Sequence, residues 1–353
     1  MPVLERLFGR GSGFQRIVLA FGASMDFDRK FDHHNPDFDV PLETVQAALP
    51  DLAIRAMTRL SGGYCNANYA LELASGERCV LRIAGREPEL VAIECALLRM
   101  LHGRLPVAEV LRVETGEGPI GRPHALLSLL PGEPLCRVED TLELSAIAAL
   151  GRQVGELAAR LHDTRFEASG FFSVDADGEL ALPDPLPTIR GPYDDLARAC
   201  LAKPVVRERL GASLFDALAT CIERDGDVAW DGLPQGRLTH SDFNQKNILV
   251  APVDGRWTVT GVLDFEFAHS GSGIDDLGNF VRFAGEQPDY GEALVEGYRA
   301  AGGQLPDDWR FRTRYLDLIP MMQGLARETI GPRSLATARA VIAESVRALH
   351  PAA

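Results

Sequence analysis

The sequence lacks long apolar runs and closely spaced cysteines, and both absences exclude classes of protein. No apolar stretch approaches the roughly 18 residues that a membrane-spanning helix needs, so we expect no membrane partner. Ile17–Phe21 is too short for a secretory signal peptide and follows too many polar residues. The six cysteines include no Cys-x-x-Cys pair and no histidine at zinc spacing. We therefore expect reduced thiols and a cytoplasmic protein.

Positive charge is scarce as well. Lysine and arginine together number 36 against 50 aspartates and glutamates, which gives a formal net charge of −14 at pH 7. This balance argues against nucleic acid or an anionic membrane as a partner. It is compatible with a cationic substrate, although acidic charge is common among soluble proteins. The lysines are only Lys30, Lys203 and Lys246.

The length and composition are those of a folded protein, except at the N-terminus. A chain of 353 residues can hold two lobes with their own cores, since domains usually contain about 100–200 residues. Residues 1–40 show neither sustained helical nor strand periodicity, so we expect a loosely ordered extension. Asp32-His33-His34 suggests metal ligands, but a solvated tail is the favoured interpretation.

A β-hairpin is the strongest local prediction. The apolar runs Ile248–Val250 and Val259–Leu263 are separated by a turn around Asp254-Gly255, and an Asp-Gly pair between β-branched runs is typical of hairpins. In a hairpin, the start of one strand lies beside the end of the other. The polar residues at these two ends are therefore expected to meet.

Three of those polar residues have the chemistry of phosphoryl transfer. Asp242 and Asn247 precede the first strand, and Asp264 follows the second. Asp242 is the candidate catalytic base for an attacking hydroxyl, while Asn247 and Asp264 offer oxygen ligands to Mg²⁺ ions on nucleotide phosphates. A lone Asp-x-x-x-x-Asn spacing would more often cap turns. With His240 before it and Asp264 after it, the pattern favours a kinase-like site.

The surrounding residues carry a family resemblance. The segment His240-Ser241-Asp242-Phe243-Asn244-Gln245-Lys246-Asn247-Ile248-Leu249, followed by Val262-Leu263-Asp264-Phe265-Glu266, resembles the aminoglycoside phosphotransferase and choline kinase-like family of small-molecule kinases. The resemblance implies a two-lobed, protein-kinase-like α+β fold, with a small antiparallel-sheet N-lobe and a mainly helical C-lobe. It also implies ATP or GTP and Mg²⁺ as cofactors and a small-molecule hydroxyl as the acceptor.

The resemblance also predicts residues that bind the nucleotide phosphates. Gly62 and Gly63 fall in a turn before the strand that contains Tyr69–Leu73, where backbone without a Cβ can approach phosphates closely. Most Gly-Gly pairs are only turns, but in the family an asparagine follows shortly, and Asn66 matches it.

The next strand, Cys79–Ile83, lacks the lysine that kinases use to hold the phosphates. Arg82 is the cation available there, and its planar guanidinium is not equivalent to an ammonium. An exposed arginine on an edge strand is the alternative. Leu90–Leu101 forms a helix with one apolar stripe, and Glu94 is the natural ion-pair partner of Arg82, with Glu89 as the competing candidate.

Two positions near the predicted site leave alternatives open. The family usually has glycine where Ser241 stands, which matters if the backbone φ is positive there. Lys246 could contact the transferred phosphate or face solvent. Asp276 is our candidate for a scaffold that hydrogen-bonds back to the catalytic loop, and His162 is expected to be a satisfied buried histidine.

The domain boundary is expected at a break between the lobes. Leu129-Leu130-Pro131-Gly132 interrupts the sheet pattern, so we assign residues 41–130 to the N-lobe and 131–353 to the C-lobe. Asp140-x-x-Glu143 resembles a capping box for a long helix that ends at His162. Further helices are predicted near Pro192–Leu201, Pro204–Leu218, Tyr290–Ala301, Asp307–Glu328 and Ser334–His350.

The functional prediction is an ATP-dependent phosphotransferase that acts on a hydroxyl group of a small molecule. A nucleotide-binding pseudokinase that acts as a regulator or scaffold is the alternative, because the strand lysine is missing. A serine hydrolase is set aside, since no Gly-x-Ser-x-Gly elbow is present. The sequence identifies neither the acceptor nor the oligomeric state.

Overall fold

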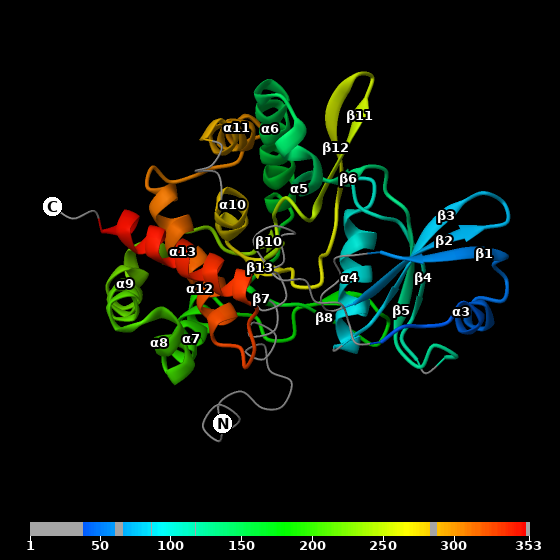
Figure 1. Cartoon of the computed structure of the whole chain (residues 1–353), viewed down its shortest axis with the longest axis horizontal. Helices are drawn as coiled ribbons and strands as arrows, with labels where there is room; N and C mark the ends of the chain where they lie inside the picture. Colours follow the sequence, from blue (N-terminus) through cyan, green and yellow to red (C-terminus); the bar gives the residue numbers. More distant parts are fainter. Residues whose placement is uncertain (1–37, 61–65, 86, 117, 283–287, 351–353) are drawn as a thin grey trace.

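The computed structural model describes residues 38–60, 66–85, 87–116, 118–282 and 288–350. An antiparallel sheet is followed by a mainly helical part, as predicted, and α4 (Pro88–Leu101) lies between the two (Figure 1). Most of the predicted N-terminal extension, residues 1–37, lies outside the described residues. Within the described ranges, no helix has both the length and the apolar character needed to span a bilayer.

The sheet has five antiparallel strands in the order β1-β2-β3-β5-β4. Its strands are Ile54–Arg59 (β1), Ala67–Leu73 (β2), Arg78–Ile83 (β3), Val110–Glu114 (β4) and His124–Ser128 (β5). Strand β4 begins at Val110 and does not include Pro106. The Pro106 carbonyl instead accepts a hydrogen bond from the N–H of Val262 in β12 (Arg256–Val262), at 2.9 Å.

The alternation of side chains on β3 gives the sheet two different faces. Leu81 and Ile83 pack with the helix α3 (Leu42–Ala48) and with Tyr69 in a small apolar core. The intervening Arg82 points to the opposite face, toward α4 and the helical part, because successive strand residues alternate. The same pattern that builds the small core therefore directs Arg82 toward the predicted site.

The helical part has a single large apolar core. Its helices are Leu135–Val138 (α5), Leu144–His162 (α6), Arg190–Leu201 (α7), Pro204–Leu210 (α8), Ala212–Trp230 (α9), Ile274–Val281 (α10), Pro288–Ala300 (α11), Trp309–Leu325 (α12) and Pro332–Leu349 (α13), with a short 3₁₀ helix at Glu139–Thr141. Short strands lie among them: Glu133–Pro134 (β6), Gly170–Phe171 (β7), Ser173–Val174 (β8), Leu180–Ala181 (β9), Arg237–Thr239 (β10), Ile248–Val253 (β11), Arg256–Val262 (β12) and His269–Gly271 (β13).

Two predictions about helix ends were wrong. Asp140 does not cap α6, because it lies in the 3₁₀ helix, and Glu143 is the N-cap residue of α6 instead. The helix predicted over residues 204–218 is two helices. Gly211 separates α8 from α9 with φ of 78°, a left-handed conformation that glycine adopts without a Cβ penalty.

Helices α6 and α11 lie side by side at a contact made by glycines (Figure 1). A Cβ atom at Gly155 of α6 would overlap the Leu294 carbonyl oxygen, and one at Gly297 of α11 would overlap the Arg152 carbonyl oxygen. The two backbones approach closely because neither position carries a side chain. This contact fixes α6, whose last residue is His162.

Replacing Gly155 with alanine should therefore destabilise the protein by about 1–3 kcal/mol, because the added methyl group forces the two helices apart. Gly191→Ala on α7 is the matched control, since a Cβ there meets no atom within 4 Å. Urea unfolding monitored by circular dichroism measures both variants. Equal stability of Gly155→Ala and the parent would contradict the close contact.

Candidate active site

The β11–β12 hairpin is present as predicted, and it determines where the site residues lie. Ile248 pairs with Val262, and the Leu263 N–H donates to the Asn247 carbonyl at 2.9 Å. The loop that precedes β11 therefore lies beside the end of β12, and Asp264 follows directly. His240 also contacts this end of the hairpin, the junction of the loop before β11 with the end of β12: its Nε2 atom lies 2.9 Å from the Leu263 carbonyl oxygen.

Asp242 is buried, and donors surround its carboxylate. Asn247 Nδ2 donates to Asp242 Oδ2 at 2.8 Å and to the Asp242 carbonyl at 2.9 Å. Asn244 donates to Oδ1, and Lys246 Nζ lies 3.6 Å from Oδ2. The two predicted residues Asp242 and Asn247 are thus in direct contact, with the carboxylate held in one orientation.

Lys246 has a definite partner. Its side chain is mostly buried and points at the Asp242 carboxylate, so the solvent-facing alternative is wrong. Its charge also lowers the pKa of Asp264, which means that it lies near both carboxylates. A cation at this position is close to where a transferred phosphate would have to lie, if Asp242 is the base.

The backbone of the loop over residues 240–247 is strained at Ser241. Its φ of 71° is left-handed, the region that favours the glycine expected from the family pattern. Three contacts hold the residue there: Asn279 Nδ2 donates to its carbonyl at 3.2 Å, its Oγ lies 2.7 Å from His269 Nδ1, and its N–H donates to Asp276 at 2.8 Å. These three contacts hold Ser241 in the left-handed conformation, so a serine can occupy a position that favours glycine.

Asp276 is the scaffold residue that the sequence predicted. Its two oxygens accept the N–H groups of His240 and Ser241, each at 2.8 Å, and one of them also lies 3.1 Å from His162 Nε2. Burial raises the pKa of Asp276, but the His162 contact and the other donors outweigh burial and leave it lowered. His162 is fully buried and also contacts the Tyr298 hydroxyl, so its structural role is confirmed.

Arg82 is the centre of a buried cluster of charges. Its Nε atom lies 2.5 Å from Glu94 Oε2, and its Nη2 atom lies 2.6 Å from Asp264 Oδ1 and 3.0 Å from Glu266 Oε2. The ion pair with Glu94 agrees with the sequence prediction, whereas Glu89 is exposed. Arg82 is buried, so the alternative of an exposed edge-strand arginine is wrong.

Glu266 is a site residue that the sequence analysis missed. It stands two positions after Asp264, and this spacing next to a candidate metal ligand was the signal that could have found it. Asn66 donates to Glu266 Oε2, and its own oxygen accepts the Gly85 N–H at 3.3 Å. Asn66 therefore contacts the charge cluster. Gly62 and Gly63, the predicted phosphate loop, lie outside the described residues.

The cluster contains three carboxyl groups around one guanidinium. Burial and the neighbouring Asp264 raise the pKa of Glu94 to about 7 against the opposing effect of Arg82, and burial raises that of Glu266 well above its usual range. Burial also raises the pKa of Asp264, but Arg82 and Lys246 outweigh it and leave it lowered. A cation bound beside this cluster would favour the ionised forms of these carboxyl groups.

The donor atoms fit Mg²⁺. Asp264 is the most accessible of the three carboxylates around Arg82, with a side chain 20% exposed, and Asn247 next to the same junction offers an amide oxygen. Carboxylate and amide oxygens are the ligands that hard divalent cations prefer. The proposed donors are oxygens, so a soft metal is not favoured here.

The fold and the site together define a kinase-like phosphotransferase. The model of the phosphotransferase enzyme family matches residues 56–313, and the chain belongs to this family. The resemblance noted in the sequence is thus confirmed. A comparison with curated proteins gave no match.

Solved structures share the fold at low sequence identity. They include the aminoglycoside phosphotransferase APH(4)-Ia, with 18% identity, 87% of this chain and 99% of that chain covered, and a TM-score of 0.61. The macrolide 2'-phosphotransferase MphH from Brachybacterium faecium has 20% identity, coverage of 88% and 98%, and a TM-score of 0.56. The GDP complex of a mutant aminoglycoside 2'-phosphotransferase-IIIa has 19% identity, coverage of 86% and 95%, and a TM-score of 0.63.

The charge cluster predicts how stability depends on pH. A carboxyl group whose pKa is raised in the native state keeps its proton longer there than in the unfolded chain, so the free energy of unfolding falls as pH rises. In Glu266→Gln this contribution is absent. Between about pH 5 and about pH 8, the free energy of unfolding of the parent should fall by more than about 1 kcal/mol relative to that of Glu266→Gln.

Urea unfolding of both proteins across this pH range measures that difference. The glutamine oxygen can still accept from Asn66, so the comparison isolates the charge. Parallel pH profiles for the two proteins would contradict the raised pKa of Glu266.

Proposed function

We propose that the protein transfers the terminal phosphate of ATP or GTP to a hydroxyl group of a small molecule, with Mg²⁺ as cofactor. The observation that carries this proposal is the junction of Asp242, Asn247 and Asp264 at one end of the β11–β12 hairpin, beside a buried arginine. These are a base, two oxygen donors for metal and a cation for phosphate, the parts that phosphoryl transfer needs.

Asp242 is the proposed catalytic base. Its carboxylate is oriented by Asn247 and Asn244, so it can accept the proton of an acceptor hydroxyl without reorganising. Lys246, 3.6 Å from Asp242 Oδ2, would stabilise negative charge on the phosphate that moves between nucleotide and acceptor.

Asn247 and Asp264 are the proposed metal ligands. When bound, Mg²⁺ would neutralise charge on the nucleotide phosphates. Arg82 Nη2 contacts Asp264 Oδ1 at 2.6 Å, so a cation on that oxygen has to compete with the guanidinium. We propose that Arg82 then turns its Nη2 toward a phosphate oxygen while its Nε stays on Glu94, and that Gly62, Gly63 and Asn66 contribute to phosphate binding.

The acceptor is proposed to be a polyhydroxylated or amine-bearing small molecule. Relatives with the same fold include complexes with AMP-PNP and hygromycin B, and one with GDP. Aminoglycosides, macrolides, choline-like amines and sugars are therefore the classes to test. The net charge of −14 is compatible with a cationic acceptor among them.

The reason for considering a pseudokinase no longer applies. This alternative was raised because the strand lysine is missing, but Arg82 makes the ion pair with Glu94 that positions such a cation.

We further propose a lobe boundary between residues 130 and 131, where β5 has ended and β6 has not begun, and a cytoplasmic location. The free thiols of the described cysteines agree with the latter: Cys79, Cys95, Cys136, Cys200 and Cys221.

A phosphotransfer screen across the four acceptor classes, with ATP and GTP in parallel, tests the function. We expect transfer to a hydroxyl of at least one class, dependent on Mg²⁺. Mass spectrometry of the product identifies the modified hydroxyl. Binding of nucleotide with magnesium but no hydrolysis and no transfer to any alcohol would favour the pseudokinase instead.

Substitution of the two aspartates separates their proposed roles. Asp242→Asn should lower the turnover number by about 10²–10⁴-fold, because the amide cannot accept the proton, while nucleotide affinity stays within a few-fold. Asp264→Asn should instead weaken nucleotide binding that depends on Mg²⁺. Steady-state kinetics and calorimetric titration with and without magnesium measure both. An Asp242→Asn variant that transfers phosphate at the parent rate sinks the mechanism.

A further inference from the structure

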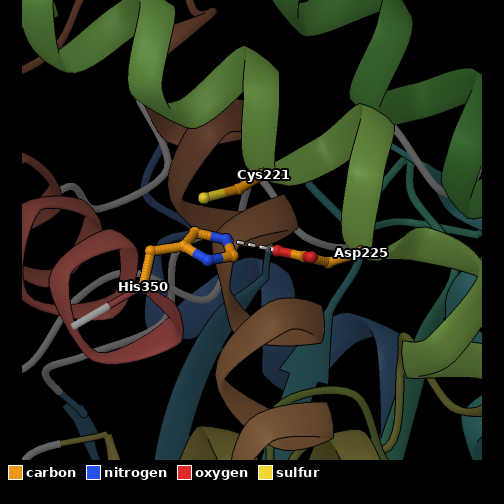
Figure 2. A group of neighbouring side chains, drawn as sticks. All are labelled: Cys221, Asp225 and His350. Carbon is orange, nitrogen blue, oxygen red and sulfur yellow. Dashed lines mark hydrogen bonds and ion pairs between the residues drawn. The ribbon is translucent and has the colours of Figure 1, made fainter. Parts of the chain in front are cut away.

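Three potential metal ligands meet at the junction of α9 and α13, outside the candidate active site. Cys221 and Asp225 lie one turn apart on α9, and His350 is the C-cap residue of α13. Figure 2 shows the three side chains pointing toward one another from the two helices. The thiol sulfur, a carboxylate oxygen and an imidazole nitrogen all lie within 4.8 Å of one another.

We propose that this cluster, the α9–α13 clasp (Cys221, Asp225 and His350), binds a borderline-soft divalent cation of the Zn²⁺ type, with water as the fourth ligand. The donor set carries the choice of metal: a thiolate and an imidazole select zinc over magnesium or calcium, which prefer oxygen alone. Cys221 and Asp225 are almost fully buried, while His350 is partly exposed and leaves a path for the ion.

The clasp already attracts a cation. Arg224 Nε donates to Asp225 Oδ1 at 3.0 Å, and Arg224 Nη2 contacts His350 Nδ1. A guanidinium can only donate, so Nδ1 is the acceptor and carries no proton. The proton therefore sits on His350 Nε2, which donates to Asp225 Oδ2 at 2.7 Å. Arg224 therefore compensates the charge of Asp225, and the Asp225 carboxylate orients the His350 ring.

Metal binding requires two proton movements and two small displacements. The Cys221 thiol releases its proton to solvent as the sulfur–metal bond forms, and the imidazole proton moves from Nε2 to Nδ1 so that the Nε2 lone pair binds the ion. Arg224 Nη2, on a half-exposed side chain, then leaves Nδ1. The 2.7 Å contact between Nε2 and Oδ2 must open to about 3.3 Å, the spacing of two ligands on tetrahedral zinc.

The clasp would join the last helix to α9. His350 is the C-cap residue of α13, and Asp225 lies in the C-terminal half of α9, so a bound ion would link two residues that are 125 positions apart in the sequence. The expected role is stabilisation of the helical part, not phosphate transfer, because metal binding that occurs only in the folded state adds to stability.

Cobalt titration of the full-length protein tests the proposal. After treatment with a chelator, Co²⁺ should produce thiolate-to-cobalt charge-transfer absorption and tetrahedral d–d bands at one equivalent, and Zn²⁺ should displace them and raise the Tm. Cys221→Ser should abolish the charge-transfer absorption, and His350→Gln should weaken Co²⁺ binding by more than about tenfold. Cys200→Ser, a buried cysteine on α7, is the matched control and should keep the signal.

Arg224→Gln gives an independent test that leaves all three ligands in place. Removing the competing guanidinium should tighten Co²⁺ binding, whereas weaker binding contradicts the electrostatic argument. Far-ultraviolet circular dichroism establishes that each variant is folded. The proposal is overturned if the parent shows no charge-transfer absorption, or if Cys221→Ser keeps that absorption. It is also overturned if Zn²⁺ raises the Tm of a parent protein that shows no charge-transfer absorption with Co²⁺.

Discussion

The buried guanidinium of Arg82 joins the two parts of the molecule. It projects from β3 of the sheet, pairs with Glu94 of α4, and contacts Asp264 and Glu266 beyond the end of β12. A charge removed from water in this way is stable only while its partners stay in place, and loss of one partner typically costs about 3–5 kcal/mol. Arg82 therefore links the sheet, α4 and the Asp264 segment at the point where phosphate and metal are expected.

The loop over residues 240–247 is held in an equally constrained way. Ser241 and Asp264 both have left-handed backbone, with φ of 71° and 70°. Asp276 holds the first through two backbone N–H groups, and His240 holds the residue before the second. Strain of this kind persists only when neighbours over-determine it, and it concentrates where side chains must be aimed. The hydrogen bonds of Asp276 and His240 thus fix the backbone from which the Asp242 side chain projects.

The Asp-Gly turn between two apolar runs predicted the hairpin, and the resemblance to small-molecule kinases predicted the Arg82–Glu94 pair and the Asp276 scaffold. The sequence did not predict the contact between Glu266 and Asn66, which lie 200 residues apart and meet only after the sheet packs on the helical part. The break at Gly211 was missed because apolar residues continue at helical spacing on both sides. The capping box failed because Asp140 completes a 3₁₀ turn. Local patterns therefore located the site, while the excess of carboxylates around Arg82 needed the tertiary structure.

The central claim is that Arg82 exchanges Asp264 for a phosphate when metal and nucleotide bind. A crystal structure of the protein with Mn²⁺ and AMP-PNP tests it most directly, since the anomalous signal of manganese locates the ion. The account predicts Mn²⁺ on oxygens of Asn247 and Asp264, with Arg82 Nη2 on a phosphate oxygen and Nε still on Glu94. Manganese bound elsewhere, or Arg82 still paired with Asp264 and remote from every phosphate, would contradict it.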